Sequence, residues 1–96
     1  MLVLITYDVN TSSSGGSKRL RKVAKICQDF GRRVQNSVFE CVISEDQVIF
    51  LKNALESVID KQNDSIRFYY LGNNYIRKVD HIGKQTAIDL TAELIF

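Results

Sequence analysis

The chain has 96 residues, of which 45% are hydrophobic and 25% are charged, and its formal net charge is +2. These values are typical of one globular domain and leave no room for a second hydrophobic core. No apolar run approaches the roughly 18 to 20 residues of a membrane span, and the amino terminus has no basic leader, so we expect a cytoplasmic protein without membrane contact.

Residues 1–10, MLVLITYDVN, predict the central strand of a sheet, buried on both faces, because the run is apolar and too short for a normal helix. Successive side chains of a strand alternate between faces, so Asp8 shares a face with Leu4 and Thr6, whereas Tyr7 points to the opposite side. Asp8 therefore ends the strand at an edge of the sheet, where open sheets commonly place their chemistry. The alternative is that Asp8 only shapes the following turn by bonding to its own backbone.

A polar, glycine-containing loop over residues 10–17 leads into an amphipathic helix. We expect this loop to be mobile and to lie beside a binding cleft. Ser14 or Ser17 is expected to cap the helix, and Gly31 to end it in a left-handed turn. The apolar stripe of the helix is Leu20, Val23, Ala24, Cys27 and Phe30.

Seven of the 13 basic residues gather in and just after this helix, against one acid, Asp29. They are Lys18, Arg19, Arg21, Lys22, Lys25, Arg32 and Arg33. Such a cluster attracts polyanions, of which nucleic acid is the commonest, although a solvated helix face gives the same pattern. Because Arg19 and Arg21 occupy the first turns, we expect them to lie close to Asp8.

The two cysteines, Cys27 and Cys41, form no C-x-x-C pair, and His81 is the single histidine. A zinc site needs three or four such ligands, so we predict none here. Free cysteine is among the most buried residue types, which predicts core positions for both. A catalytic thiol is the alternative and would need His81, which we expect at the surface.

The remaining segments complete a βαββαβ order. Residues 33–43 predict one kinked strand or two short ones divided at Asn36 and Ser37, and residues 65–71 predict a further strand. Between them, Ser44 and Gln47 form the capping box of a second helix. Its apolar stripe is Val48, Leu51, Leu55, Val58 and Ile59. This order is the split βαβ arrangement of a ferredoxin-like sandwich, an α+β fold with an antiparallel sheet and both helices on one face.

Helices on one face leave apolar side chains on the other face of the sheet, and a second copy of the chain is the economical cover. The carboxy-terminal segment holds short strand-like pieces at 79–82, 88–90 and 94–96. We predict a single domain over residues 1–96, with a core of about 1–72 and a dimerisation tail of about 73–96 exchanged in a two-fold homodimer. The alternative is that the tail pairs with its own sheet.

Several segments together resemble the small CRISPR-associated nucleases of the Cas-two family. They are LITYDV at 4–9, KRLRKV at 18–23, RVQNSVFE at 33–40, LGNN at 71–74 and VDHIG at 79–83. The resemblance covers essentially the whole chain. It implies a ferredoxin-like homodimer that cleaves phosphodiester bonds in RNA or double-stranded DNA with Mg²⁺, or with Mn²⁺. It also implies a place between two copies of the larger integrase subunit, of the Cas-one family, during spacer acquisition in antiviral defence.

The resemblance also implies roles for individual residues. Asp8 would bind the metal, with Tyr7 as its neighbour, and Ser37 and Phe39 would line the site. The residues that would contact nucleic acid are Arg19, Arg21, Lys22 and Arg33. In a two-fold dimer, the two Asp8 carboxylates could face each other and hold an ion that neither binds alone. By strand parity alone Tyr7 belongs to the core, and Phe39 is either core or a stacking platform.

Two other functions stay open at this point. One is a non-catalytic DNA-binding scaffold of the integrase, in which the basic helix follows phosphates and Asp8 is dispensable. The other is a ferredoxin-like regulator of metabolism, which predicts no salt-dependent affinity for DNA. Phosphate contacts carry no base information, so the choice between RNA and DNA is also open.

Overall fold

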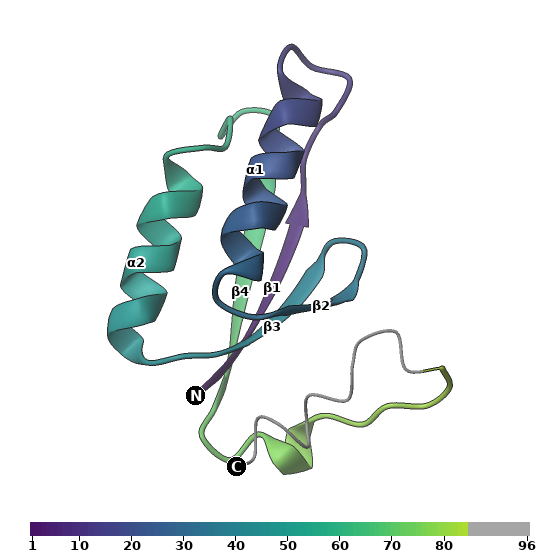
Figure 1. Ribbon diagram of the computed structural model, residues 1–96, viewed down its shortest axis with the longest axis vertical. Coiled ribbons are helices and arrows are strands. Elements are labelled where there is room, and N and C mark those ends of the chain that lie inside the picture. The colour runs from purple at the N-terminus through teal and green to yellow at the C-terminus, as the bar shows by residue number, and fades with distance from the viewer. Residues whose placement is uncertain (85–96) are drawn as a thin grey trace.

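The computed structural model describes residues 1–84. In chain order, its elements are β1 (Leu2–Asp8), α1 (Gly16–Gln28), β2 (Arg32–Gln35), β3 (Val38–Val42), α2 (Glu45–Glu56), β4 (Ser65–Gly72) and a 3-10 turn, η1 (Ile76–Lys78). The four strands form one antiparallel sheet in the order β2-β3-β1-β4. Both helices lie on one face of the sheet (Figure 1), which leaves the other face, the open face, without a helix. The predicted ferredoxin-like fold is confirmed.

Strand β1 is an internal strand, as predicted, with Ile5 paired to Phe39 of β3 on one side and to Phe68 of β4 on the other. Its side chains toward the helices, including Ile5, are buried. On the open face, Leu4 and Thr6 are only half-buried in the single chain. The prediction of a strand buried on both faces therefore holds for the face toward the helices, whereas on the open face it holds for Leu2 but not for Leu4 and Thr6.

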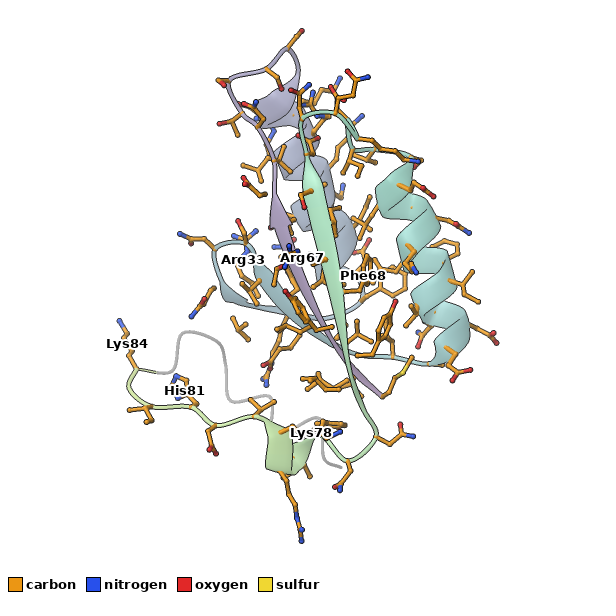
Figure 2. All side chains as sticks on the ribbon, turned by 180° about the vertical axis from the view of Figure 1, so that it is seen from behind. Arg33, Arg67, Phe68, Lys78, His81 and Lys84 are labelled. Atoms are coloured by element: carbon orange, nitrogen blue, oxygen red, sulfur yellow. The ribbon has the colours of Figure 1, made fainter. Side chains whose placement is uncertain are left out.

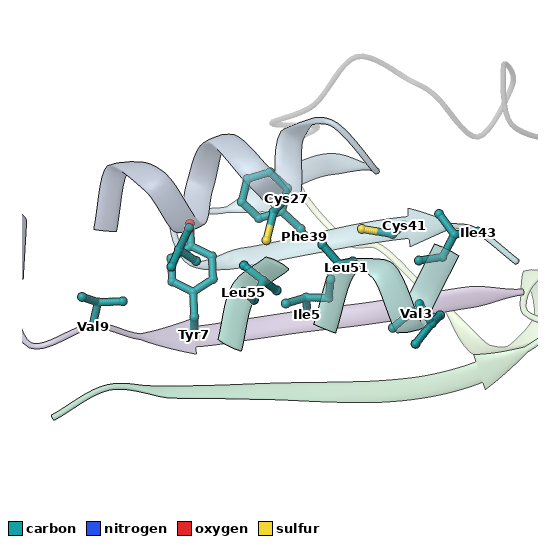
Figure 3. Close-up of a cluster of buried hydrophobic side chains, with 12 residues drawn as sticks. Val3, Ile5, Tyr7, Val9, Cys27, Phe39, Cys41, Ile43, Leu51 and Leu55 are labelled. Carbon is teal, nitrogen blue, oxygen red and sulfur yellow. The ribbon is translucent and has the colours of Figure 1, made fainter. Parts of the chain in front are cut away.

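The hydrophobic core lies between the helices and the sheet, and Figure 3 shows its side chains converging from both layers. Cys27 of α1 and Cys41 of β3 are both fully buried, which confirms their predicted core positions. Burial raises the pKa of Cys27 to about 12 and that of Cys41 to about 11. Both thiols stay protonated at neutral pH, so neither serves as a nucleophile.

The start of α1 differs from the prediction. The residue before the helix is Gly15, in a left-handed conformation with φ of 74°, and no side chain caps the first turn. The following Gly16 is buried, and a Cβ there would collide with the carbonyl of Asn10. Neither Ser14 nor Ser17 caps the helix, because the backbone turns in through two glycines instead.

The predictions for the two other helix ends had different outcomes. Gly31 is not left-handed; a Cβ on it would collide with the carbonyl of Glu40 and with Cys41, so glycine is needed here for close packing against β3. The capping box of α2 is confirmed. The backbone N–H of Gln47 donates to Ser44 Oγ at 3.2 Å, and the backbone N–H of Ser44 donates to Gln47 Oε1 at 2.9 Å.

The tail is only partly described. Residues 79–82 are not a strand, and within residues 73–84 no segment joins the sheet. Lys78 of η1 donates to the carbonyl of Leu71 at 2.9 Å, and His81 lies at the surface, as predicted. The predicted strands at 88–90 and 94–96 lie outside the described residues. Among residues 1–84, no helix has the length and apolar character needed to cross a membrane.

Candidate functional site: the carboxylate at the end of the central strand

Asp8 is the last residue of β1 and lies opposite Ser65, the first residue of β4. Its side chain is exposed and shares the open face with Thr6. Within residues 1–84, no ion pair or side-chain hydrogen bond involves the Asp8 carboxylate. Asn10 shapes the turn instead, because its Oδ1 accepts the backbone N–H of Ser12 at 3.1 Å. Asp8 is therefore free to bind a ligand, and the turn-shaping alternative is wrong.

Tyr7 and Phe39, which the resemblance placed at the site, are core residues. Their exposed fractions are 6% and 0%, and their rings stack with centroids 6.1 Å apart. Both point toward the helices, on the face opposite Asp8, because of strand alternation. Phe39 is therefore no stacking platform for a base. Tyr7 donates its hydroxyl to the carbonyl of Asn36 at 3.4 Å, and burial raises its pKa.

The β2–β3 hairpin places Ser37 and Arg33 beside this aromatic pair. Ser37 is half-buried, and its carbonyl accepts the backbone N–H of Tyr7 at 3.1 Å. The exposed Arg33 holds its guanidinium 5.3 Å from the centre of the Phe39 ring. It also lines an open pocket of about 470 Å³ with its neighbours in the hairpin, Val34, Gln35 and Asn36. Arg33 thus remains available to a phosphate at the edge of the sheet.

Arg19 is held by a buried carboxylate and is not left free to contact a phosphate. Its Nε donates to Asp64 Oδ2 at 2.7 Å, and its two terminal nitrogens donate to the Ser14 carbonyl at 2.7 Å and to Ser13 Oγ at 2.6 Å. The Arg19 side chain is 15% exposed, and that of Asp64 is fully buried. The hydrogen bonds that Arg19 donates are the main reason why the pKa of Asp64 falls to about 2. The Arg19 guanidinium thus already has protein acceptors. The same hydrogen bonds hold the loop over residues 10–17, which the sequence predicted to be mobile.

The exposed cations of α1 are spaced three or four residues apart, which places them on one side of the helix, and we call them the basic stripe. It consists of Lys18, Arg21, Lys22 and Lys25. The stripe belongs to α1, which covers one face of the sheet (Figure 1), whereas strand alternation places Asp8 with Thr6 on the open face. The expectation that Arg21 lies close to Asp8 is therefore wrong within one subunit, because α1 packs over the opposite face.

Sequence reasoning missed one cation on the face of Asp8. Arg67 of β4 lies opposite Thr6, which makes it a diagonal neighbour of Asp8 on the open face. Figure 2 shows Arg67 near the middle of that face, and its Nη1 donates to the hydroxyl of Tyr69 at 3.2 Å. The predicted strand over residues 65–71 contains Arg67, but the register of β4 with β1 is needed to bring this residue beside Asp8.

A family model described as "CRISPR associated protein Cas2" matches residues 1–79. This chain belongs to the Cas2 (Cas-two) family. A relative from Halalkalibacterium halodurans, named CRISPR-associated endonuclease Cas2, is 64% identical over 96 residues, covering 100% of both chains. A relative from Rhodospirillum rubrum, named CRISPR-associated endoribonuclease Cas2 3, is 53% identical over 94 residues, covering 98% of this chain and 99% of the relative.

The solved structures agree with this assignment to the Cas2 family. A crystal structure of Streptococcus pyogenes Cas2 at pH 6.5 superposes with a TM-score of 0.76 at 54% identity, covering 86% of this chain and 100% of that chain. The family resemblance and the fold are thus confirmed together. Membership in this family also argues against a regulator of metabolism, the third function that the sequence had left open.

The residues of one subunit fit a partial metal site. Among residues 1–84, no group of three or more His, Cys, Asp and Glu side chains could hold a metal ion. Mg²⁺ accepts such a sparse site, because it keeps several waters and is commonly held by one or two carboxylates together with substrate phosphates. Asp8 supplies one exposed carboxylate without an internal partner. The described chain therefore supplies one carboxylate that a Mg²⁺ ion could use, and any further ligand would have to come from elsewhere.

Proposed function

We propose that this member of the Cas2 family is a cytoplasmic, Mg²⁺- or Mn²⁺-dependent endonuclease that cleaves RNA or double-stranded DNA and takes part in spacer acquisition during antiviral defence. The observation that carries this proposal is the exposed Asp8 carboxylate at the end of the central strand, which has no ion-pair partner among the described residues 1–84. It occurs in a chain that is 64% identical to a relative named CRISPR-associated endonuclease Cas2.

Each residue near Asp8 has a definite part in this proposal. The Asp8 carboxylate binds the ion, which when bound supplies a Lewis acid and an acidified water. Arg67, the diagonal neighbour of Asp8 on the open face, forms charge-assisted hydrogen bonds with the phosphate. Tyr7 and Phe39 hold the end of β1 from the core and do not touch the substrate.

A homodimer completes the site. The open face presents half-buried Leu4, Val38 and Val42, together with Tyr69, which is 42% exposed. Within residues 1–84, β4 also forms an edge of the sheet and pairs only with β1. A second copy packed on this face removes apolar surface from water and brings a second Asp8 toward the first. The exchange of tails over residues 73–96 belongs to the same proposal.

Nucleic acid binds the basic stripe and Arg33. Each of these cations is exposed, so each can replace a counterion on the phosphate backbone. Substituting Arg21→Gln should lower the slope of log affinity against log salt by about 0.9 for duplex DNA. A flat salt response of the unaltered protein would contradict nucleic-acid binding by this surface.

A second candidate function is a non-catalytic scaffold that holds DNA for the larger integrase subunit of the Cas-one family. The observation in its favour is the separation of the basic stripe from Asp8, which lie on opposite sides of the sheet. DNA bound along α1 would not have to reach Asp8 of the same subunit. In this function the basic stripe is essential and Asp8 is dispensable.

The substitution Asp8→Asn separates the two functions, with Asp29→Asn as the control because Asp29 is an exposed acid at the end of α1. We expect Asp8→Asn to lower Mg²⁺-dependent cleavage of labelled RNA or duplex DNA by at least about 100-fold, since metal stabilisation contributes several kcal/mol. Chelation of the metal should have the same effect on the control. Undiminished cleavage by Asp8→Asn would contradict the nuclease, and undiminished spacer acquisition in cells would favour the scaffold.

A further inference from the structure

A second carboxylate, Asp64, lies at the same end of the β1–β4 pair as Asp8. Asp64 directly precedes Ser65, which is the partner of Asp8 in the last pair of the ladder. Asn10, two residues after Asp8, donates its backbone N–H to Asp64 Oδ1 at 3.0 Å. The two chain segments that leave the sheet beyond Asp8 and Ser65 therefore meet at the Asp64 carboxylate.

Arg19 extends this junction to the loop that follows β1. Its guanidinium contacts both oxygens of Asp64, at 2.7 Å from Nε and at 3.3 Å from Nη2. The same group holds Ser13 and Ser14, so one side chain fixes the loop to the turn before β4. Asp64 also accepts the backbone N–H of Asp60 at 2.9 Å. We call this set of contacts the Arg19-Asp64 clamp.

Strand β3 does not reach the end of β1. The paired register of β1 with β3 ends at Thr6 and Val38, and one more hydrogen bond joins the Tyr7 N–H to the Ser37 carbonyl. Beyond that point, within the described chain, only β4 pairs with β1. A strand end with a single neighbour frays readily unless other contacts hold it.

We propose that the Arg19-Asp64 clamp positions the Asp8 carboxylate for metal binding, and that Arg19 acts through Asp64 rather than by contacting phosphate. This inference rests on the proposed metal-dependent function. Arg19 and Asp64 are positioning residues: they orient the backbone around Asp8 without touching the ion or the substrate. Groups that orient a metal ligand typically change metal affinity by 10- to 100-fold when they are removed.

The two possible roles of Arg19, contact with phosphate and action through Asp64, predict different effects when Arg19 and Asp64 are substituted together. If Arg19 contacted phosphate, Arg19→Gln would lower the salt slope of DNA binding by about 0.9, and its effect would add to that of Asp64→Asn. If Arg19 acts through Asp64, each single variant should weaken Mn²⁺ binding to a similar degree. The double variant should then be no worse than either single variant, because the same contact is lost in all three.

The experiment is calorimetric titration of Mn²⁺ into the wild-type chain, Asp64→Asn, Arg19→Gln and the double variant. The matched control is Glu56→Gln, because Glu56 pairs with Lys61 at 2.7 Å in an exposed position and is not one of the residues of the clamp. We expect the Kd for Mn²⁺ to rise about tenfold in each clamp variant and to stay unchanged in the control. Hydrogen exchange of the Asn10 backbone N–H should become faster in the clamp variants only.

The possible results separate the inference from the proposed function. If the wild-type protein binds no Mn²⁺, the proposed metal site itself is wrong. Normal wild-type binding with an unchanged Kd in Asp64→Asn would overturn only the role of the clamp, and so would additive effects with a lowered salt slope in Arg19→Gln. If Asp64→Asn does not fold, Arg19→Lys keeps the charge but loses the two-pronged contact, and an unchanged Kd in that variant overturns the inference equally.

Discussion

Two carboxylates at one end of the sheet show how differently the same chemical group is used. Asp8 is exposed, and no ion pair within residues 1–84 involves it. Asp64 is buried and accepts hydrogen bonds from Arg19, Asn10 and Asp60. A buried carboxylate must be paired to be tolerated, whereas an exposed one keeps its oxygens for a ligand. The comparison predicts a structural role for Asp64 and agrees with the ligand-binding role proposed for Asp8.

The largest effect is expected on stability, from Asp64→Ala. This change leaves the mostly buried guanidinium of Arg19 and two backbone N–H groups without their acceptor, and should cost about 3 kcal/mol of unfolding free energy. Urea denaturation at one fixed protein concentration measures it as a lower midpoint with an unchanged slope. The control Glu56→Ala breaks an exposed pair and should cost less than about 1 kcal/mol. Equal losses in both variants would contradict the comparison.

The next effect is the dependence of stability on acid. The pKa of Asp64 is depressed to about 2 from an ordinary value of 3.8, chiefly by the hydrogen bond from Arg19. A depressed pKa stabilises the fold above the unfolded value, and this contribution, on the order of 2 kcal/mol, is lost as the pH falls from about 4 through 2. Unfolding curves across this range should be steeper in pH for the wild-type chain than for Asp64→Asn. Parallel curves would show that Asp64 is not the group responsible.

The sequence predicted the part of this comparison that depends on local periodicity. Alternation along β1 placed Tyr7 in the core and Asp8 on the other face, and the structure agrees. The pairing of Arg19 with Asp64 joins residues 45 positions apart and depends on how α1 packs beside the turn before β4. One sequence signal was present. Arg19 lies four residues before the buried Val23 and therefore on the inward side of the helix, whereas Arg21 lies only two residues before Val23 and points elsewhere.

Other departures from prediction have the same origin in tertiary packing. Gly31 was expected to end α1 in a left-handed turn, but its requirement for glycine comes from contact with β3, which no local pattern reveals. Residues 79–82 have the composition of a strand, yet within the described chain they pair with neither β2 nor β4, the two edge strands of the sheet. Such features depend on what lies opposite a segment, so a single sequence predicts them poorly.

A smaller effect is expected from Ser13→Ala, which tests how the clamp holds the loop. Ser13 Oγ accepts from Arg19 Nη2 at 2.6 Å and donates to the Asn10 carbonyl at 2.7 Å. Removing these bonds in a partly buried position should cost about 1 kcal/mol. Ser12→Ala is the matched control, because Ser12 bonds only to the exposed Asn10 side chain, and it should cost less. If Ser12→Ala is the more harmful change in thermal denaturation, the loop is held by its own turn rather than by Arg19.

The smallest effect on stability is expected from Asp8→Asn, the variant with the largest expected effect on cleavage. The side chain is exposed and has no ion-pair partner in the part of the chain that the structure describes, and asparagine has nearly the same shape. The unfolding free energy should therefore change by less than about 0.5 kcal/mol. In the proposed homodimer two Asp8 carboxylates repel each other, so any change should favour the folded dimer. Urea denaturation of Asp8→Asn and Asp64→Asn under the same conditions compares their unfolding free energies. A loss above about 1 kcal/mol would mean that Asp8 supports the fold and is not held free for a ligand.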